Sequence, residues 1–144
     1  MMTLRQLLQS KEGKVWSVTS TETVFESLKL MAEKNIGAVL VIDGGSLVGI
    51  MSERDYARKV VLQGRSSKDT LVKDIMTQKV IYVRPDETIE ECMALMTEKH
   101  IRHLPVIDKG TLLGLISIGD VVRALISEQK FIIEQLENYI SGGR

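Results

Sequence analysis

Two stretches of the sequence follow one pattern: Gly49-Ile50-Met51-Ser52-Glu53-Arg54-Asp55 and Gly114-Leu115-Ile116-Ser117-Ile118-Gly119-Asp120. In each, an apolar run that contains a glycine leads into Ser-x-x-Asp. A serine at this place caps a helix by accepting a hydrogen bond from the N3 amide, and an aspartate at N3 suits the positive end of the helix dipole. The pattern therefore predicts a strand followed by a serine-capped helix, twice in the chain.

The two stretches belong to a longer internal repeat. Residues 15–64 align with residues 80–129 without a gap, at an offset of 65 residues, and 19 of the 50 aligned pairs are identical. Two copies of this length do not make a solenoid, so the repeat predicts a duplicated subdomain with a pseudo-two-fold axis. A half of roughly fifty residues buries too little apolar surface to be stable alone, so the halves are expected to pack together.

Each copy is expected to open with a short strand and a helix. The strand is predicted at residues 15–18 and 80–83, and Ser20-Thr21 or Pro85-Asp86 would then supply the N-cap of the helix, from Thr21 or Asp86. Apolar residues recur in that helix at i, i+4 and i+7, which predicts one buried face. These residues are Val24, Leu28 and Met31, matched by Ile89, Met93 and Met96.

A hairpin and a second helix complete each copy. Asp43-Gly44-Gly45 and Asp108-Lys109-Gly110 suit the positive φ angles of a tight turn between strands. The helix that follows is expected to bury Tyr56, Val60 and Val61 in the first copy, or Val121, Leu125 and Ile126 in the second. The fold class is therefore α+β, with two pseudo-symmetric β-α-β-β-α repeats packed through their sheets.

The ends of the repeats set the domain boundaries. Residues 1–68 are predicted to form the first repeat with a lead-in helix, and residues 69–144 the second repeat with an extended C-terminal helix. That last helix has more apolar residues than one repeat needs: Phe131, Ile132, Leu136, Tyr139 and Ile140. Such a surplus usually meets another chain, which predicts a homodimer.

Composition excludes several classes of protein. Lys+Arg and Asp+Glu are both 19, so the formal net charge is zero, and aromatic residues make up 4%. A neutral chain with few aromatic residues argues against nucleic-acid binding and against attraction to anionic membranes. The one cysteine cannot form an intramolecular disulfide, and no signal peptide or membrane-spanning run is evident, so we expect a cytoplasmic protein without membrane insertion.

The sequence offers no constellation for catalysis. Walker A and GxGxxG motifs are absent, and no nucleophile, base and oxyanion group can be assembled, so neither an enzyme nor a catalytic cofactor is expected. His100 and His103 have His-x-x-His spacing but no third metal ligand nearby in the sequence. Cys92 matches Ser27 in the repeat, which favours a small packed residue over a nucleophile.

The arrangement resembles the tandem CBS-domain module, also called a Bateman module, of the stand-alone type. The two Gly-Ser-Asp patterns carry the resemblance. Asp74-Ile75-Met76-Thr77 is similar to the family's lead-in to a repeat, and residues 101–108, IRHLPVID, are similar to its central strand. The resemblance covers nearly the whole chain. It implies a signal-transduction sensor of AMP, ADP or ATP that regulates a partner protein and does not catalyse a reaction.

The resemblance also implies nucleotide sites in clefts between the two repeats. Asp55 and Asp120 would hold the ribose diol, and Ser52 and Ser117 would lie near ribose or phosphate, which a helix N-terminus attracts. Adenine would lie against Val18 and Ile36 in one copy and against Val83 and Ile101 in the other. The remaining implied contacts are Gly37, Ala38, Glu53, Arg54, Thr77, Arg102, His103 and Gly119.

The two implied sites differ in charge. Arg102 and His103 resemble the family's phosphate-contacting place, whereas the first copy offers Arg54 at its helix start. The alternative for Arg54 is a solvated first-turn residue, which the helix dipole disfavours, so a ligand contact is slightly favoured. Gly119 either lets a backbone amide approach phosphate or only accommodates the cap. Two mononucleotides, or one dinucleotide such as NAD(H), would suit unequal sites. The alternative function is a homodimerising scaffold that regulates a partner without a nucleotide, its two motifs serving only as helix caps.

Overall fold

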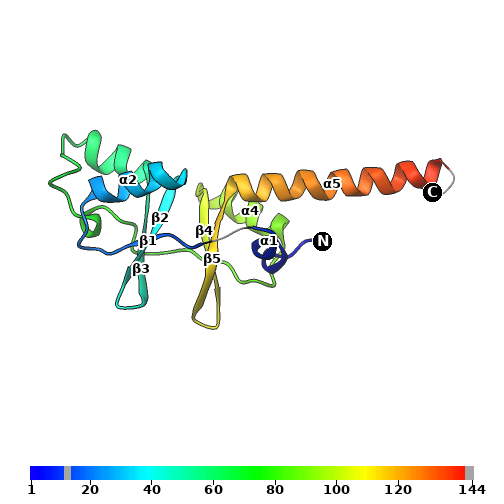
Figure 1. Ribbon diagram of the computed structural model, residues 1–144, viewed down its shortest axis with the longest axis horizontal. Coiled ribbons are helices and arrows are strands. Elements are labelled where there is room, and N and C mark those ends of the chain that lie inside the picture. Colours follow the sequence, from blue (N-terminus) through cyan, green and yellow to red (C-terminus); the bar gives the residue numbers. More distant parts are fainter. Residues whose placement is uncertain (12–13, 142–144) are drawn as a thin grey trace. The chain divides into compact units, whose positions relative to one another are not determined.

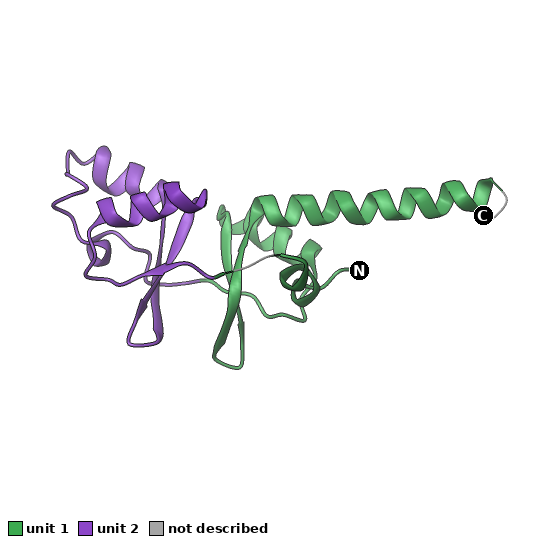
Figure 2. Ribbon diagram, in the orientation of Figure 1, with its two compact units in different colours: residues 1–14, 81–144 green, residues 15–80 purple. Residues whose placement is uncertain are grey.

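A computed structural model describes residues 1–11 and 14–141, and the chain forms two compact units (Figures 1 and 2). Unit 1 consists of Met1–Lys14 and Ile81–Arg144, and unit 2 consists of Val15–Val80. This grouping differs from the predicted division into 1–68 and 69–144. The segment that precedes the first copy joins the second copy, and residues 69–80, which precede the second copy, join the first.

Unit 2 contains the first copy of the repeat. Its three strands form one sheet in the order β1-β2-β3, with β1 parallel and β3 antiparallel to β2. The π-helical turn η1 directly continues α3, and the 3-10 turn η2 lies in the segment that leads to the second copy. The elements are β1 (Ser17–Val18), α2 (Val24–Lys34), β2 (Ala38–Asp43), β3 (Ser46–Ser52), α3 (Glu53–Tyr56), η1 (Ala57–Val61) and η2 (Val72–Asp74).

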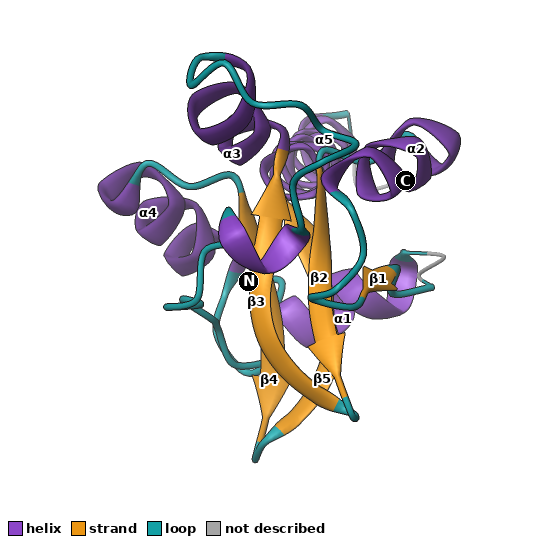
Figure 3. Ribbon diagram, turned by 90° about the vertical axis from the view of Figure 1, so that its left-hand side faces the viewer, coloured by secondary structure: helices purple, strands orange, loops and turns teal. Residues whose placement is uncertain are grey.

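Unit 1 contains the second copy and the N-terminal helix. Its strands form an antiparallel hairpin, β4-β5, drawn with the β2-β3 hairpin in Figure 3. The strand predicted at 80–83 is reduced to a single parallel bridge between Val83 and Val106. The elements are α1 (Leu4–Ser10), α4 (Ile89–Lys99), β4 (His103–Asp108), β5 (Thr111–Ser117) and α5 (Ile118–Ile140). Helices combined with small sheets in both units confirm the α+β class.

The tight turns and the serine caps are confirmed. Gly44 and Gly45 have φ of 55° and 82°, and Lys109 and Gly110 have 49° and 82°. The Ser52 hydroxyl accepts from the backbone of Asp55, and Ser117 does the same with Asp120. These features depend on a few consecutive residues, which is why the sequence pattern predicts them well.

The caps predicted at Thr21 and Asp86 are wrong. Helices α2 and α4 are instead capped by Thr23 and Thr88, whose side chains accept from the backbone amides of Glu26 and Glu91. In the first copy the Ser20 hydroxyl donates to Asp43 at 2.6 Å, so this turn is tied to the end of β2 and the helix starts after it.

The burial predicted for the final helices is confirmed only in part. Val60 and Val121 are fully buried, but Val61 is 51% exposed and Ile126 is 55% exposed. The wider π-helical turn at Ala57–Val61 buries Val60 and leaves Val61 outside. The next turn of α5 is already largely exposed, so Ile126 has no core to enter.

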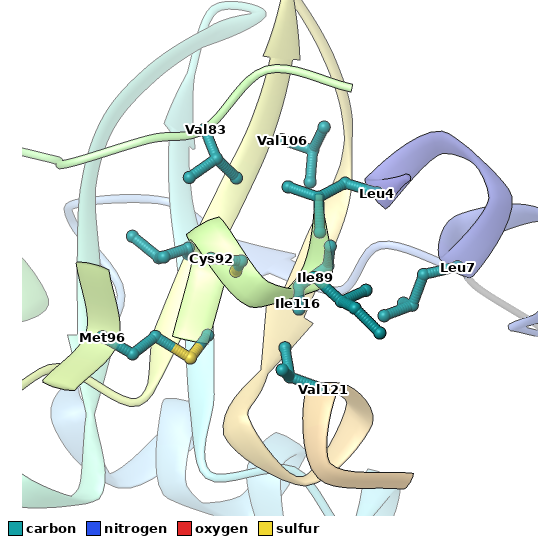
Figure 4. Close-up of a cluster of buried hydrophobic side chains, with 10 residues drawn as sticks. Leu4, Leu7, Val83, Ile89, Cys92, Met96, Val106, Ile116 and Val121 are labelled. Atoms are coloured by element: carbon teal, nitrogen blue, oxygen red, sulfur yellow. The ribbon is translucent and has the colours of Figure 1, made fainter. Parts of the chain in front are cut away.

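Each lead-in segment packs on the copy that it does not precede. Leu4 and Leu7 of α1 enter the unit 1 core beside Ile89, Ile116 and Val121 (Figure 4). The exchange is equivalent in both units, because the Leu4 amide donates to Glu87 O at 2.8 Å and the Val72 amide donates to Glu22 O at 2.9 Å. Glu22 and Glu87 occupy the same repeat position, so Leu4 and Val72 are structural counterparts.

Candidate functional site

The first candidate site lies in unit 2, where β3 ends and α3 begins. Ser52 and Asp55 form a capping box: the Ser52 amide donates to Asp55 Oδ2 at 2.9 Å, and the Asp55 amide donates to Ser52 Oγ at 3.2 Å. The other carboxylate oxygen, Oδ1, faces Lys59 Nζ at 3.1 Å and Thr77 Oγ1 at 3.4 Å. Only 13% of the Asp55 side chain is exposed. The cap therefore fixes one carboxylate oxygen and leaves the other toward a cation and a hydroxyl.

Neighbouring segments bring further predicted residues to this helix start. The Glu53 amide donates to Gly37 O at 3.0 Å, and Ala38 pairs with Ser52 in the sheet. Thr77 reaches Asp55 because its backbone pairs with Ile50, with N–O distances of 2.9 and 3.0 Å. Gly37, Ala38, Ser52, Asp55 and Thr77 thus gather at one end of the hairpin.

The second candidate site lies in unit 1, at the junction of β5 and α5. The Ser117 amide donates to Asp120 Oδ2 at 2.8 Å, and the Asp120 amide donates to Ser117 Oγ at 3.2 Å. Two cations contact the carboxylate at 2.8 Å, with Lys11 Nζ on Oδ2 and Arg123 Nη2 on Oδ1. Only 11% of the Asp120 side chain is exposed. Asp120 is therefore held more tightly than Asp55.

His103 and Arg102 belong to the same electrostatic cluster. His103 pairs with Ser117 across the hairpin, and the Ile118 amide donates to Arg102 O at 2.8 Å. Burial lowers the pKa of His103; Asp120 acts in the opposite direction, while Lys11 and Arg102 lower the pKa further. Of the two basic residues predicted as phosphate contacts, His103 therefore lies within electrostatic reach of Asp120 and Lys11, and Arg102 is an exposed neighbour of His103.

Competing effects set the charge of Asp120. Burial by itself raises the pKa of this carboxyl, but the hydrogen bonds from Lys11 and from the Ser117 amide, with the positive charge of Lys11, bring the net pKa below its ordinary value. Asp120 is therefore an anion at neutral pH, and a carboxylate with remaining lone pairs accepts hydroxyl donors such as a ribose diol.

Sequence reasoning missed Lys11. Its ammonium donates to Leu115 O at 2.7 Å as well as to Asp120. Leu115 is the repeat counterpart of Ile50, so in unit 1 one lysine side chain contacts the two groups that the backbone and hydroxyl of Thr77 contact in unit 2. Lys11 lies outside the aligned repeat and has no partner in its pattern. Arg123, the second cation on Asp120, lies inside the repeat and matches Arg58.

The other predicted residues are placed with less relation to the carboxylates. Val18 and Val83 are buried, whereas Ile36 and Ile101 are partly exposed. Glu53 and Arg54 are exposed on the first turn of α3. A Cβ on Gly119 would lie 3.3 Å from Arg123 Nη1 and 3.6 Å from Ser117 Oγ, so this glycine leaves room for the arginine above the cap.

Cys92 is a core residue. It is fully buried in unit 1, and burial, with a smaller contribution from Glu87, raises the pKa of its thiol to about 11. Within residues 1–11 and 14–141, no group of three or more His, Cys, Asp or Glu side chains is arranged to hold a metal ion. No helix in that same part of the chain has the length and apolar content needed to cross a membrane.

Comparison with known proteins identifies the repeat. The family model of the CBS domain matches residues 10–62 and 72–127. The CBS domain-containing protein CBSX3, mitochondrial, of Arabidopsis thaliana is 44% identical over 140 residues, covering 94% of this chain and 68% of the plant protein.

Solved structures agree with this assignment. A protein with CBS domains from Burkholderia ambifaria is 56% identical, with a TM-score of 0.86, covering 89% of this chain and 96% of its own. The CBS domain pair of MJ0100, solved with 5'-methylthioadenosine and S-adenosyl-L-methionine, has a TM-score of 0.78 at 24% identity, covering 89% of this chain and 98% of its own. This chain, with two matched repeats and the fold of a CBS pair, belongs to the CBS-domain family.

Proposed function

We propose that this CBS pair is a non-catalytic regulatory module of the cytoplasm that binds adenosine-containing nucleotides at Asp55 and Asp120. One observation carries the proposal: at both places a mostly buried carboxylate has one oxygen fixed by a serine cap while the other faces an exposed cation. Arg123 is 73% exposed and Lys59 is 44% exposed, so a ligand can displace them at little cost. The freed oxygen would then accept the hydroxyls of a ribose.

The charges around each aspartate support a phosphorylated ligand. Lys11 and Arg123 contact Asp120, Arg102 acts electrostatically on the neighbouring His103, and Lys59 with Arg54 provides positive charge near Asp55. Cationic donors and helix N-termini are the groups that hold phosphate in proteins. The ligand class therefore includes AMP, ADP and ATP, with NAD(H) as a dinucleotide candidate, and Ser52 and Ser117 would lie beside the ribose.

The MJ0100 pair supports adenosine compounds as ligands that this fold can accommodate, since that protein was solved with two of them. At 24% identity the likeness extends to the fold, so the choice of ligand for this chain rests on the two Ser-x-x-Asp sites.

Isothermal titration calorimetry against AMP, ADP, ATP and NADH tests the proposal. We expect binding below millimolar concentration by at least one of them. Asp120→Ala and Asp55→Ala should each weaken one site by about 1.5 to 3 kcal/mol, because hydrogen bonds to charged groups contribute about that much. Asp86→Ala, at an exposed aspartate outside both sites, is the matched control and should bind as the wild type does. Absence of binding by all four ligands would exclude the function.

A second function is favoured by the same caps. In both Ser-x-x-Asp motifs the serine and aspartate amides are paired with each other's side chains, which a purely structural role as a helix cap would explain. Under this alternative the chain is a homodimerising scaffold that regulates a partner, and α5 supplies the dimer contact. It predicts that saturating nucleotide leaves the thermal midpoint unchanged, whereas ligand binding to the folded state must raise it.

A further inference from the structure

The C-terminal part of α5 carries an apolar surface that no described element covers. The helix spans Ile118–Ile140, 23 residues, and every residue from 129 to 141 is exposed. Figure 1 shows this part continuing beyond the other elements of unit 1 as a single rod. Large apolar side chains lie along it with 40% to 82% exposure: Val122, Ile126, Ile132, Ile133, Leu136, Tyr139 and Ile140. A helix this apolar and this exposed normally has a partner.

The spacing of these side chains matches a two-helix seam. Val122, Ile126, Ile133, Leu136 and Ile140 alternate steps of four and three residues when Gln129 completes the series. Steps of four and three average 3.5 residues, which keeps one stripe facing a partner helix along its length. We call these six positions the seam. Phe131, although 61% exposed, lies on the opposite side of the helix.

The two edges of the seam differ in chemistry. Lys130 and Glu137, seven residues apart, lie along one edge, and both are exposed. Among the described residues, neither takes part in an ion pair. Leu125, Ile132 and Tyr139, also at intervals of seven, lie along the other edge. One edge is therefore charged with both signs, and the other is apolar.

This asymmetry decides how a second copy would dock. In a parallel pair, unlike edges meet, so Lys130 and Glu137 would lie against apolar side chains of the partner. In an antiparallel pair, like edges meet. Lys130 then faces Glu137 of the partner subunit, Glu137 faces Lys130 of the partner subunit, and the apolar edges meet each other. The charged residues pair in this way when the two-fold axis passes near Ile133.

We infer that α5 is a dimerisation element that pairs antiparallel with α5 of a second copy, with Ile133 at the two-fold axis. The interface is isologous, because each chain contributes the same seam and the same two edges. The overlap extends over residues 126–141, about 24 Å of helix at 1.5 Å per residue, so it contains the seam from Ile126 onward and leaves Val122 outside. Since this is the exposed part of α5, the remaining elements of unit 1 lie at opposite ends of the helix pair.

The inference rests on the homodimer of the second proposed function and does not depend on nucleotide binding. Sedimentation velocity with the full chain tests both the dimer and its geometry. The wild type should sediment as a dimer at 50 µM, and Ile133→Glu should be a monomer. Lys130→Glu and Glu137→Lys should each raise the dimer dissociation constant at least fivefold, and the double variant should restore it to within twofold. Glu134→Lys makes the same charge change away from the seam and should have no such effect. A monomeric wild type would contradict both proposals.

Disulfide trapping tests the orientation directly. In a Cys92→Ser background, Lys130→Cys mixed with Glu137→Cys should form a heterodisulfide faster than either variant links to itself. Linkage of Lys130→Cys to itself would overturn the register centred near Ile133, because like edges would then meet around residue 130. Failure of the double charge exchange to restore dimerisation would overturn the pairing of Lys130 with Glu137 of the partner subunit. Either result would leave a dimer in place. A wild-type dimer that is insensitive to Ile133→Glu would remove α5 from the interface.

Discussion

Asp55 in unit 2 and Asp120 in unit 1 occupy the same repeat position and form the same capping box, yet their surroundings differ. Asp55 faces one cation and a threonine hydroxyl, whereas Asp120 is held by Lys11 and Arg123, both at 2.8 Å. The cap is local and identical in both copies. Lys59 and Arg123 belong to the repeat, but Thr77 and Lys11 come from lead-in segments outside it, and these segments give the two sites different charge.

The lead-ins also explain why the two copies cannot be separated at the repeat boundary. Leu4 belongs to the core of unit 1, and Val72 belongs to the core of unit 2, although each precedes the other copy in the chain. The first copy therefore depends on the segment that follows it, and the second copy on the segment that precedes the first, for part of its core and for part of its site.

The largest expected effect is a test of this exchange. Leu4→Ala removes a fully buried side chain, so it should cost about 2 to 5 kcal/mol, and the loss should fall on unit 1. Hydrogen exchange should accelerate in β4 and β5, and Val72→Ala should instead accelerate β2 and β3. Faster exchange of β2 and β3 in Leu4→Ala would mean that α1 stabilises the copy that it precedes.

The next test compares two equivalent glycines at these contacts. A Cβ on Gly49 would lie 2.7 Å from Met76 Sδ and 3.0 Å from Thr77 O, whereas a Cβ on Gly114 would meet only Leu8, at 2.8 Å. Overpacking costs about 1 to 3 kcal/mol, and a side chain yields more easily than a backbone. Gly49→Ala should therefore lower the urea midpoint more than Gly114→Ala. Equal urea midpoints would show that both lead-in segments shift equally well to accommodate the added methyl group.

The third test concerns Lys11, whose side chain contacts in unit 1 the groups equivalent to those that Thr77 contacts in unit 2. Lys11→Met should destabilise the protein by about 1 kcal/mol at pH 7, because it removes a charge-assisted bond that is partly exposed to solvent. Lys14→Met, at an exposed lysine, is the control. Burial raises the pKa of Asp120, whereas Lys11 and the Ser117 amide lower it, and the net pKa lies below its ordinary value. The stabilisation is thus present above about pH 4 and lost as the carboxylate protonates below that pH.

Acid denaturation gives Lys11→Met a second readout. With the lysine gone, the pKa of Asp120 should rise and less stability should be lost between pH 4 and pH 2 than in the wild type. An unchanged acid profile would show that Lys11 contributes little to holding Asp120 ionised.

The smallest effect is expected from substituting His103, whose counterpart in the first copy is Ala38. Burial lowers the pKa of His103, so the unfolded chain takes up a proton first and the free energy of unfolding should fall as the pH drops below about 6.5. His103→Asn should reduce that fall, which thermal melts between pH 7.5 and 5.5 would measure. His100→Asn, at a position where the first copy has Asn35, retains His103 and should show the wild-type fall.

Sequence reasoning succeeded where neighbouring residues decide the structure. The caps at Ser52 and Ser117 and the turn at Gly44-Gly45 follow from short-range sterics and hydrogen bonds. It failed at Thr21, because Ser20 is bound to Asp43 at the end of a strand far along the chain. A pattern in sequence does not reveal which distant group a side chain meets.

The sequence by itself determined the duplication, the order of elements and the two aspartates, because repeated letters and helix caps are properties of nearby residues. Only the tertiary structure decided which lead-in serves which copy and that Lys11 contacts Asp120. Those contacts join residues far apart in the chain, 109 positions for Lys11 and Asp120, and their partners are chosen by how buried side chains pack. Such packing partners are not marked by any repeat, spacing or motif in the sequence, so the sequence alone does not predict them.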